Sequence, residues 1–160
     1  MSRALHIELK KISAERSSLA CRRPDGTATW SRLDSFYPLH DLAHFAVESE
    51  LGLRRGFFGL IADGWQLDNF AERGFAARLP AESFLAENLV GTIERLGDDL
   101  SPPEFATALT NSLAAQNLPP FRVLSADELA RIRATRAALI ARWRALPVGE
   151  TLRLDFPLDD

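Results

Sequence analysis

The stretch LHIELK, residues 5–10, decides the fold that we expect for this chain, because its apolar and polar residues alternate strictly. Such period-two alternation is typical of a β-strand that buries one face and exposes the other. A second strand is predicted around Leu19 and Cys21. The turn residues PDGT, 24–27, then lead into a third strand over residues 28–32, so the chain begins with a three-stranded antiparallel meander.

The other end of the chain carries a matching pattern in TLRLDFP, residues 151–157. Leu152, Leu154 and Phe156 alternate with polar residues, and Pro157 ends the strand because proline has no N–H to donate. A single strand needs a pairing partner, and the N-terminal meander is the one candidate. We therefore expect both chain ends to meet in one antiparallel sheet, with the segment between them packed on one of its faces.

The middle of the chain is predicted to be helical. Ser101 and Ser125 are each followed by glutamate three residues later and by apolar residues, which is the sequence signature of a capped helix start. The predicted helices span about residues 39–51, 81–96, 102–116 and 126–145, with Pro38 in the first turn of the first one and Gly97 as the stop of the second. The predicted fold is α+β, a single domain over residues 1–160, with a small antiparallel sheet packed against four to five helices.

Composition excludes several classes of protein. The formal net charge of −3 and a pI of about 5.6 give no basic field, so nucleic acid is not an expected partner. Cys21 is the sole cysteine, which excludes an internal disulfide and a thiolate metal cage. No apolar run approaches the roughly 20 residues of a membrane span, and the alternating start of the chain is unlike a signal peptide. We therefore expect a cytoplasmic protein without membrane partners.

One predicted helix concentrates the reactive side chains of the chain. At about 100° per residue, His40, Asp41, His44 and Glu48 all fall within one quadrant of the helix over residues 39–51. This quadrant borders the apolar stripe that should face the core. The four side chains are therefore expected at the edge of a cleft.

The spacing of these residues predicts a metal site. Two histidines at positions i and i+4 can bind one ion, and Glu48 could be a third ligand or could orient a histidine. Asp41 is the candidate catalytic residue, as a general base toward a metal-activated water. The hypothesis is a metal-binding protein, with zinc the favoured divalent transition metal, and a metal-dependent hydrolase as the activity.

The segment HDLAH, residues 40–44, resembles the HExxH helix of the zincin metalloproteases. That resemblance implies that His40 and His44 bind zinc and that Asp41 stands where the zincins have their catalytic glutamate. Aspartate reaches about 1.5 Å less than glutamate, and a misplacement of that size can cost about 100-fold in rate. The wider pattern HDLAHFAVE, LGL and GFFGL is similar to a family of uncharacterised bacterial proteins and implies no activity.

Two other interpretations stay open at this point. The histidines could have a structural role at the edge of the core, bonded to nearby carboxylates. Alternatively, the chain could be a non-enzymatic interaction module that uses the aromatic loop 56–65 or the arginine-rich helix 126–145. The expected partner is a small molecule or a peptide.

Overall fold

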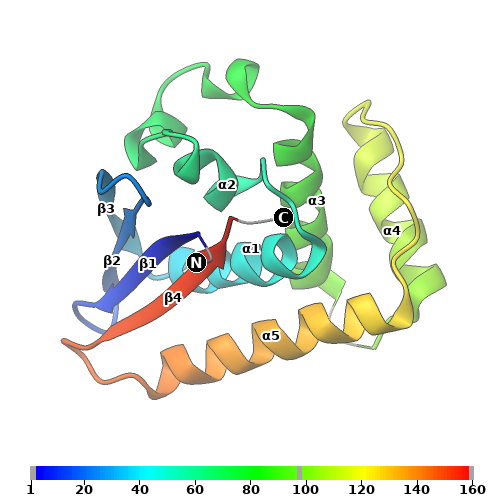
Figure 1. Cartoon of the computed structure of the whole chain (residues 1–160). Coiled ribbons are helices and arrows are strands. Elements are labelled where there is room, and N and C mark those ends of the chain that lie inside the picture. Colours follow the sequence, from blue (N-terminus) through cyan, green and yellow to red (C-terminus); the bar gives the residue numbers. More distant parts are fainter. Residues whose placement is uncertain (1–2, 97–98, 159–160) are drawn as a thin grey trace.

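The two ends of the chain form one sheet, as the alternating segments predict. The computed structural model describes residues 3–96 and 99–158. The strands are β1 (Ala4–Lys11), β2 (Arg16–Arg22), β3 (Ala28–Asp34) and β4 (Thr151–Pro157). All pairs are antiparallel and the order is β3-β2-β1-β4, so the last strand lies beside the first (Figure 1). Ile7 lies opposite Cys21 on one side and Leu154 on the other.

One face of this sheet is buried and the other is in solvent. Leu5, Ile7 and Leu9 of β1 are almost fully buried, whereas the polar residues between them are exposed. The buried face packs against helices, which hold the other half of the same apolar cluster. The predicted α+β architecture is therefore confirmed.

The helices are α1 (Tyr37–Leu51), α2 (Phe57–Ala62), α3 (Ala81–Leu96), α4 (Pro102–Ala115) and α5 (Ala126–Ala145), with two short 3₁₀ helices, η1 (Leu67–Ala71) and η2 (Phe75–Arg78). The two predicted serine caps are confirmed, since Ser101 and Ser125 accept hydrogen bonds from the backbone N–H of the third residue of their helices. Gly97, the predicted stop of α3, lies outside the described residues. In the described part of the chain no helix combines the length and the apolar character that crossing a membrane needs.

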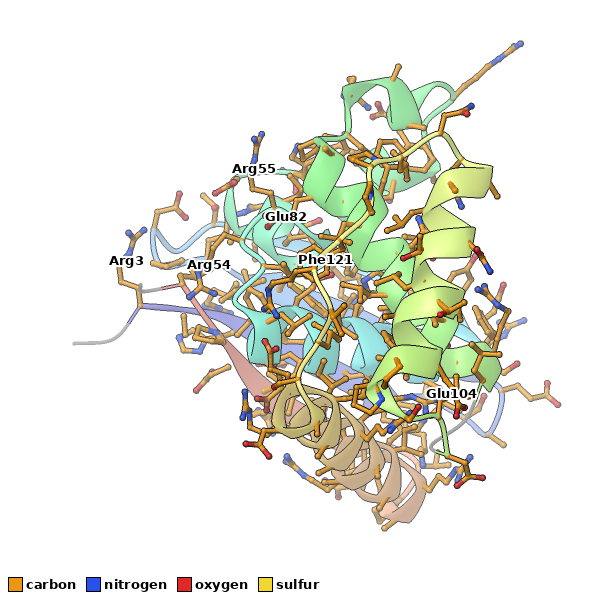
Figure 2. All side chains as sticks on the ribbon, turned by 90° about the vertical axis from the view of Figure 1, so that its right-hand side faces the viewer. Arg3, Arg54, Arg55, Glu82, Glu104 and Phe121 are labelled. Carbon is orange, nitrogen blue, oxygen red and sulfur yellow. The ribbon has the colours of Figure 1, made fainter. Side chains whose placement is uncertain are left out.

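Helix α1 is the centre of the molecule. It packs against α3, α5 and the sheet, so its sides belong to two apolar clusters. Leu42 joins the cluster at the sheet, whereas Ala43 and Val47 join the cluster that α3, α4 and α5 complete. Phe121, on the extended segment between α4 and α5, packs against this second cluster (Figure 2). The remaining side of α1 carries the polar residues.

The aromatic segment predicted as a loop is in part a helix, α2, which long-range contacts stabilise at both ends. At its start, Glu48 of α1 accepts hydrogen bonds from the backbone N–H groups of Phe57 and Phe58, each at 2.9 Å. At its end, the buried Arg23 donates to the carbonyl oxygen of Ile61 at 2.6 Å. Six residues are too few for a stable isolated helix, so local sequence patterns do not predict it.

Candidate metal centre

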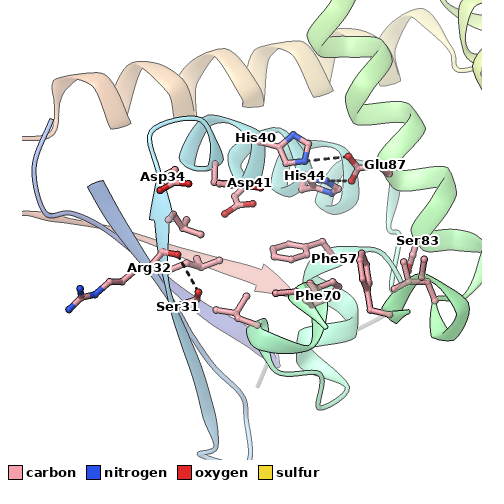
Figure 3. A pocket seen from close by; sticks show the side chains of 18 of the residues that line it. Ser31, Arg32, Asp34, His40, Asp41, His44, Phe57, Phe70, Ser83 and Glu87 are labelled. Atoms are coloured by element: carbon pink, nitrogen blue, oxygen red, sulfur yellow. Dashed lines mark hydrogen bonds and ion pairs between the residues drawn. The ribbon is translucent and has the colours of Figure 1, made fainter. Parts of the chain in front are cut away.

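A pocket of about 560 Å³ opens beside the polar side of α1 (Figure 3). Its volume is in the range of small-molecule sites in proteins. Residues of β3, α1, α2, η1, η2 and α3 surround it. Most of its wall is apolar, whereas one side presents the titratable groups His40, Asp41, His44 and Glu87.

His40 and His44 lie one helical turn apart on α1, with ring centroids separated by 4.8 Å. Both rings direct Nε2 at the carboxylate of Glu87 on α3, at 3.4 Å for His40 and 2.9 Å for His44 (Figure 3). One ligand atom from each of the three residues lies within 4.8 Å of the other two. Ligand atoms on a tetrahedral zinc ion are about 3.3 Å apart, so side-chain shifts of up to about 1.5 Å would bring all three onto one ion.

The other ring nitrogen of each histidine is held by a separate carboxylate. Nδ1 of His44 is 2.8 Å from Glu48 Oε2, and Nδ1 of His40 is 3.0 Å from Glu94 Oε1. Histidines that bind metals usually donate their second ring N–H to a carboxylate or carbonyl in this way, which fixes the tautomer and the ring orientation. The arrangement therefore leaves both Nε2 atoms directed at the Glu87 carboxylate, His40 at Oε1 and His44 at Oε2.

Glu48 is fully buried, and its two oxygens have several partners at once. Besides His44, they accept the two backbone N–H groups at the start of α2, where a negative charge is also favoured by the helix dipole. Gly56 makes room for this carboxylate, because a Cβ at Gly56 would lie 2.5 to 2.8 Å from its carbon and oxygens. Glu48 therefore ties the position of His44 to the start of α2.

Replacing Gly56 with alanine should displace Glu48 and weaken metal binding without touching a ligand. Loss of a partner that orients a metal-binding histidine costs roughly 10- to 100-fold in affinity, and we expect a loss in that range for Gly56→Ala. Zinc titration measures it. Gly91→Ala is the matched control, since the Cβ there would approach only the flexible end of Arg95 at 3.1 Å. Equal zinc affinity of the two variants would contradict the coupling.

Asp41 lies on the same side of α1 and points into the pocket (Figure 3). Its side chain is buried, with 6% of the residue exposed, and Oδ2 has no hydrogen-bond partner within the described residues. Burial raises the pKa of Asp41 to about 7, against the opposing effect of the charges of His44 and His40. A buried carboxyl group that titrates near neutral pH and faces a pocket is suited to accept and return a proton.

The electrostatics of the histidine pair depend on the three glutamates around it. Burial alone would lower the pKa of His44, but the hydrogen bonds and charges of Glu48 and Glu87 raise it to about 10. Burial likewise opposes the charged form of His40, and hydrogen bonds to Glu87 and Glu94 still raise its pKa. The hydrogen bonds from both histidines hold the pKa of Glu87 well below its usual range. The site is thus a strongly negative environment that attracts a cation, whether a proton or a metal ion.

The structure places the four residues singled out from the sequence as follows. His40 and His44 come together as predicted, and Asp41 lines the same pocket. Glu48, predicted as a ligand, contacts Nδ1 of His44, on the opposite edge of the ring from the nitrogen that faces Glu87. Its oxygens are occupied by backbone N–H groups, which fits the orienting role that the sequence left open.

Sequence reasoning missed the two glutamates that α3 contributes. Glu87 and Glu94 are seven residues apart, so they share one face of the predicted helix over residues 81–96. That spacing was the available signal. It could not show that this face meets α1, because the packing of two helices depends on contacts distant in sequence.

Comparisons of the chain with protein-family models, with curated proteins and with solved structures found no match. The resemblance to an uncharacterised bacterial family therefore stays a prediction.

The two segments considered for an interaction module differ in exposure. Phe58, Leu60 and Ile61 of the aromatic segment are buried in the core. On α5, Arg131 lies 3.6 Å from Glu50, and Arg133 donates to a backbone carbonyl at 3.1 Å. The aromatic segment thus belongs to the core, whereas Arg142 and Arg144 of α5 are exposed, and the interaction module stays a prediction.

Proposed function

We propose that the chain binds a zinc ion through Nε2 of His40, Nε2 of His44 and a carboxylate oxygen of Glu87, and that it acts as a metal-dependent hydrolase. The observation that carries the proposal is the convergence of these three ligand atoms within 4.8 Å at the wall of a pocket. Two imidazoles and one carboxylate are a donor set that zinc accepts, and three protein ligands leave one position open.

The surroundings of the three residues favour a catalytic over a structural role for the ion. Structural zinc sites have four protein ligands and are closed to solvent. Here Glu87 is well exposed, with 59% of its side chain accessible, whereas His44 is buried at 5%. The site therefore lies at the boundary between the core and the pocket, where a substrate could reach the open position.

A bound zinc ion would supply Lewis-acid activation of a water molecule and of a carbonyl oxygen. Residues of the chain would transfer the proton and hold the ligands in place. Asp41 accepts the proton as the water oxygen bonds to the carbonyl carbon, and returns it to the leaving oxygen or nitrogen as that bond breaks. Glu48 and Glu94 hold the two imidazoles in place throughout. In this scheme an ester or amide plus water gives an acid and an alcohol or amine.

Calorimetric titration of zinc into the metal-free, untagged chain tests the proposal. We expect one ion per chain, and a gain of about 2.7 kcal/mol in unfolding free energy when free zinc is 100 times Kd. The double variant His40→Ala, His44→Ala should lose saturable binding. His6→Ala is the control, because His6 lies on the exposed face of β1 beside Asp155. Absence of stoichiometric binding, or equal binding by the double variant, would refute the proposal.

A further inference from the structure

The wall of the pocket divides into two chemically different parts. The titratable groups from α1 and α3 form one side, and the remainder is built mainly from β3, the 3₁₀ helices and the start of α3. The apolar part includes Leu33, Phe57, Leu67, Phe70, Phe75 and Leu79. A molecule that fills the pocket would therefore have its polar group at the histidines and an apolar body along the apolar part of the wall.

Three phenylalanines give the apolar part an aromatic character. The Phe57 and Phe70 rings are 4.9 Å apart between centroids with a tilt of 55°, and Phe75 follows edge-on at 6.3 Å from Phe70. The series begins at the metal-binding side, since the Phe57 ring is 5.6 Å from the His44 ring between centroids, and Figure 3 shows Phe70 beyond Phe57. Tilted and edge-on arrangements are those in which aromatic rings attract one another, so a further ring in this series is favoured over a linear chain.

The apolar part of the pocket wall offers no cation to an anionic group. Asp34, Asp41 and Glu87 line the pocket, and Asp41 is buried without a partner for Oδ2 within the described residues. Arg32 is the one basic side chain among the lining residues other than the histidines. Arg32 is exposed, with its guanidinium 5.9 Å from the Trp30 ring, and it points away from the pocket (Figure 3). The histidines lie on the titratable side of the pocket, so a carboxylate or phosphate held among Phe70 and Phe75 would be desolvated without a compensating cation.

From these observations we infer the substrate class of the site: an uncharged small molecule that carries an aryl group next to its hydrolysable ester or amide bond. The aryl group lies along Phe57, Phe70 and Phe75, and the carbonyl group lies at His40 and His44. This inference rests on the proposed hydrolase function for the position of the reacting bond. The pocket itself, and hence its preference for a neutral aryl group, does not depend on a metal ion.

Titration with three small amides tests whether the pocket prefers this substrate class. Acetamide, benzamide and 4-carboxybenzamide are titrated into the metal-free and the zinc-loaded chain, and the backbone amide NMR shifts of pocket residues are followed. Burial of the phenyl ring should make benzamide bind on the order of 10- to 100-fold tighter than acetamide. The added carboxylate should weaken the binding of 4-carboxybenzamide at least about tenfold relative to benzamide, because it would be desolvated at the apolar part of the wall without a cation. We expect the same ranking with and without zinc.

Phe75→Ala tests the location of the ring, with Val123→Ala as the control for loss of an apolar side chain outside the pocket. The Phe75 variant should weaken benzamide and leave acetamide unchanged, and the Val123 variant should change neither. Equal binding of benzamide and 4-carboxybenzamide, or benzamide shifts outside the pocket, would overturn the substrate class while leaving zinc binding intact. If the chain did not bind zinc but still preferred benzamide, the proposed hydrolase function would be refuted and the preference of the pocket for a neutral aryl group would be supported.

Discussion

Replacing Glu87 with glutamine should lower the affinity for zinc at least about 100-fold while the chain stays folded. Loss of an orienting partner already costs roughly 10- to 100-fold, and loss of a ligand should cost more. The amide keeps the size of the side chain but lacks the negative charge that faces both Nε2 atoms at 2.9 and 3.4 Å. Because the Glu87 side chain is largely exposed, the substitution should leave the core intact. Zinc titration and thermal unfolding measure the two effects.

Glu104→Gln is the matched control for this experiment, since Glu104 is an exposed glutamate on α4 that does not line the pocket (Figure 2). Its zinc affinity should equal that of the parent chain. Glu48→Gln should show the converse balance, with a smaller loss of affinity and a larger loss of stability, because Glu48 is buried and bonded to α2. If Glu48→Gln lost more zinc affinity than Glu87→Gln, Glu48 would be the ligand and Glu87 the orienting residue.

Replacing Asp41 with asparagine should remove hydrolysis and keep the metal. General-base catalysis contributes typically 100- to 10,000-fold, so kcat/KM of the zinc-loaded chain toward a neutral aryl ester such as phenyl acetate should fall by about that factor. Asparagine has the shape of the protonated acid, and the pKa of Asp41 near 7 means that the neutral form is already compatible with the fold. The variant should therefore bind one zinc ion per chain with unchanged affinity.

The control is Asp68→Asn, because Asp68 is exposed on η1 and does not line the pocket. Its kcat/KM should match that of the parent chain. If Asp41→Asn retains full kcat/KM, Asp41 is not the base. If it loses the metal together with the activity, Asp41 acts as a ligand and the assignment of roles changes.

The sheet and four of the helices could be predicted from the sequence because their signals are local. Alternation in residues 5–10 and 151–157 reports one buried face, and the Ser125 cap bonds a residue three positions away. Helix α2 lacks such a signal. Its ends are fixed by Glu48 and Arg23, which are distant in sequence, so only the folded chain shows why the aromatic segment is helical there.

The residues of the candidate site also differ in whether local sequence patterns predict them. His40, Asp41 and His44 share one side of α1, and helical periodicity alone brings them together. Glu87 reaches the histidines only because α1 and α3 pack side by side, which no pattern within either helix specifies. Glu48 fitted the helical pattern of a ligand equally well. The contacts with α2 that give it an orienting role became evident only from the structure.

A metal-free account of the same contacts also exists. His44 could remain protonated between Glu48 and Glu87 as a buried ionic network, a kind of arrangement that often adds little stability compared with apolar residues. Such a network would explain the short contacts. It would not explain why a buried carboxyl group beside it, Asp41, lacks a partner for Oδ2 within the described residues and faces a pocket.

The most direct test of the metal centre is a crystal structure of the zinc-loaded chain, with anomalous diffraction recorded on both sides of the zinc absorption edge. Our account predicts one strong anomalous peak per chain, about 2.0 to 2.2 Å from Nε2 of His40, Nε2 of His44 and an oxygen of Glu87. The peak should border the pocket that Asp41 lines. No peak at this position, with His44 still bonded to both Glu48 and Glu87, would contradict the central claim.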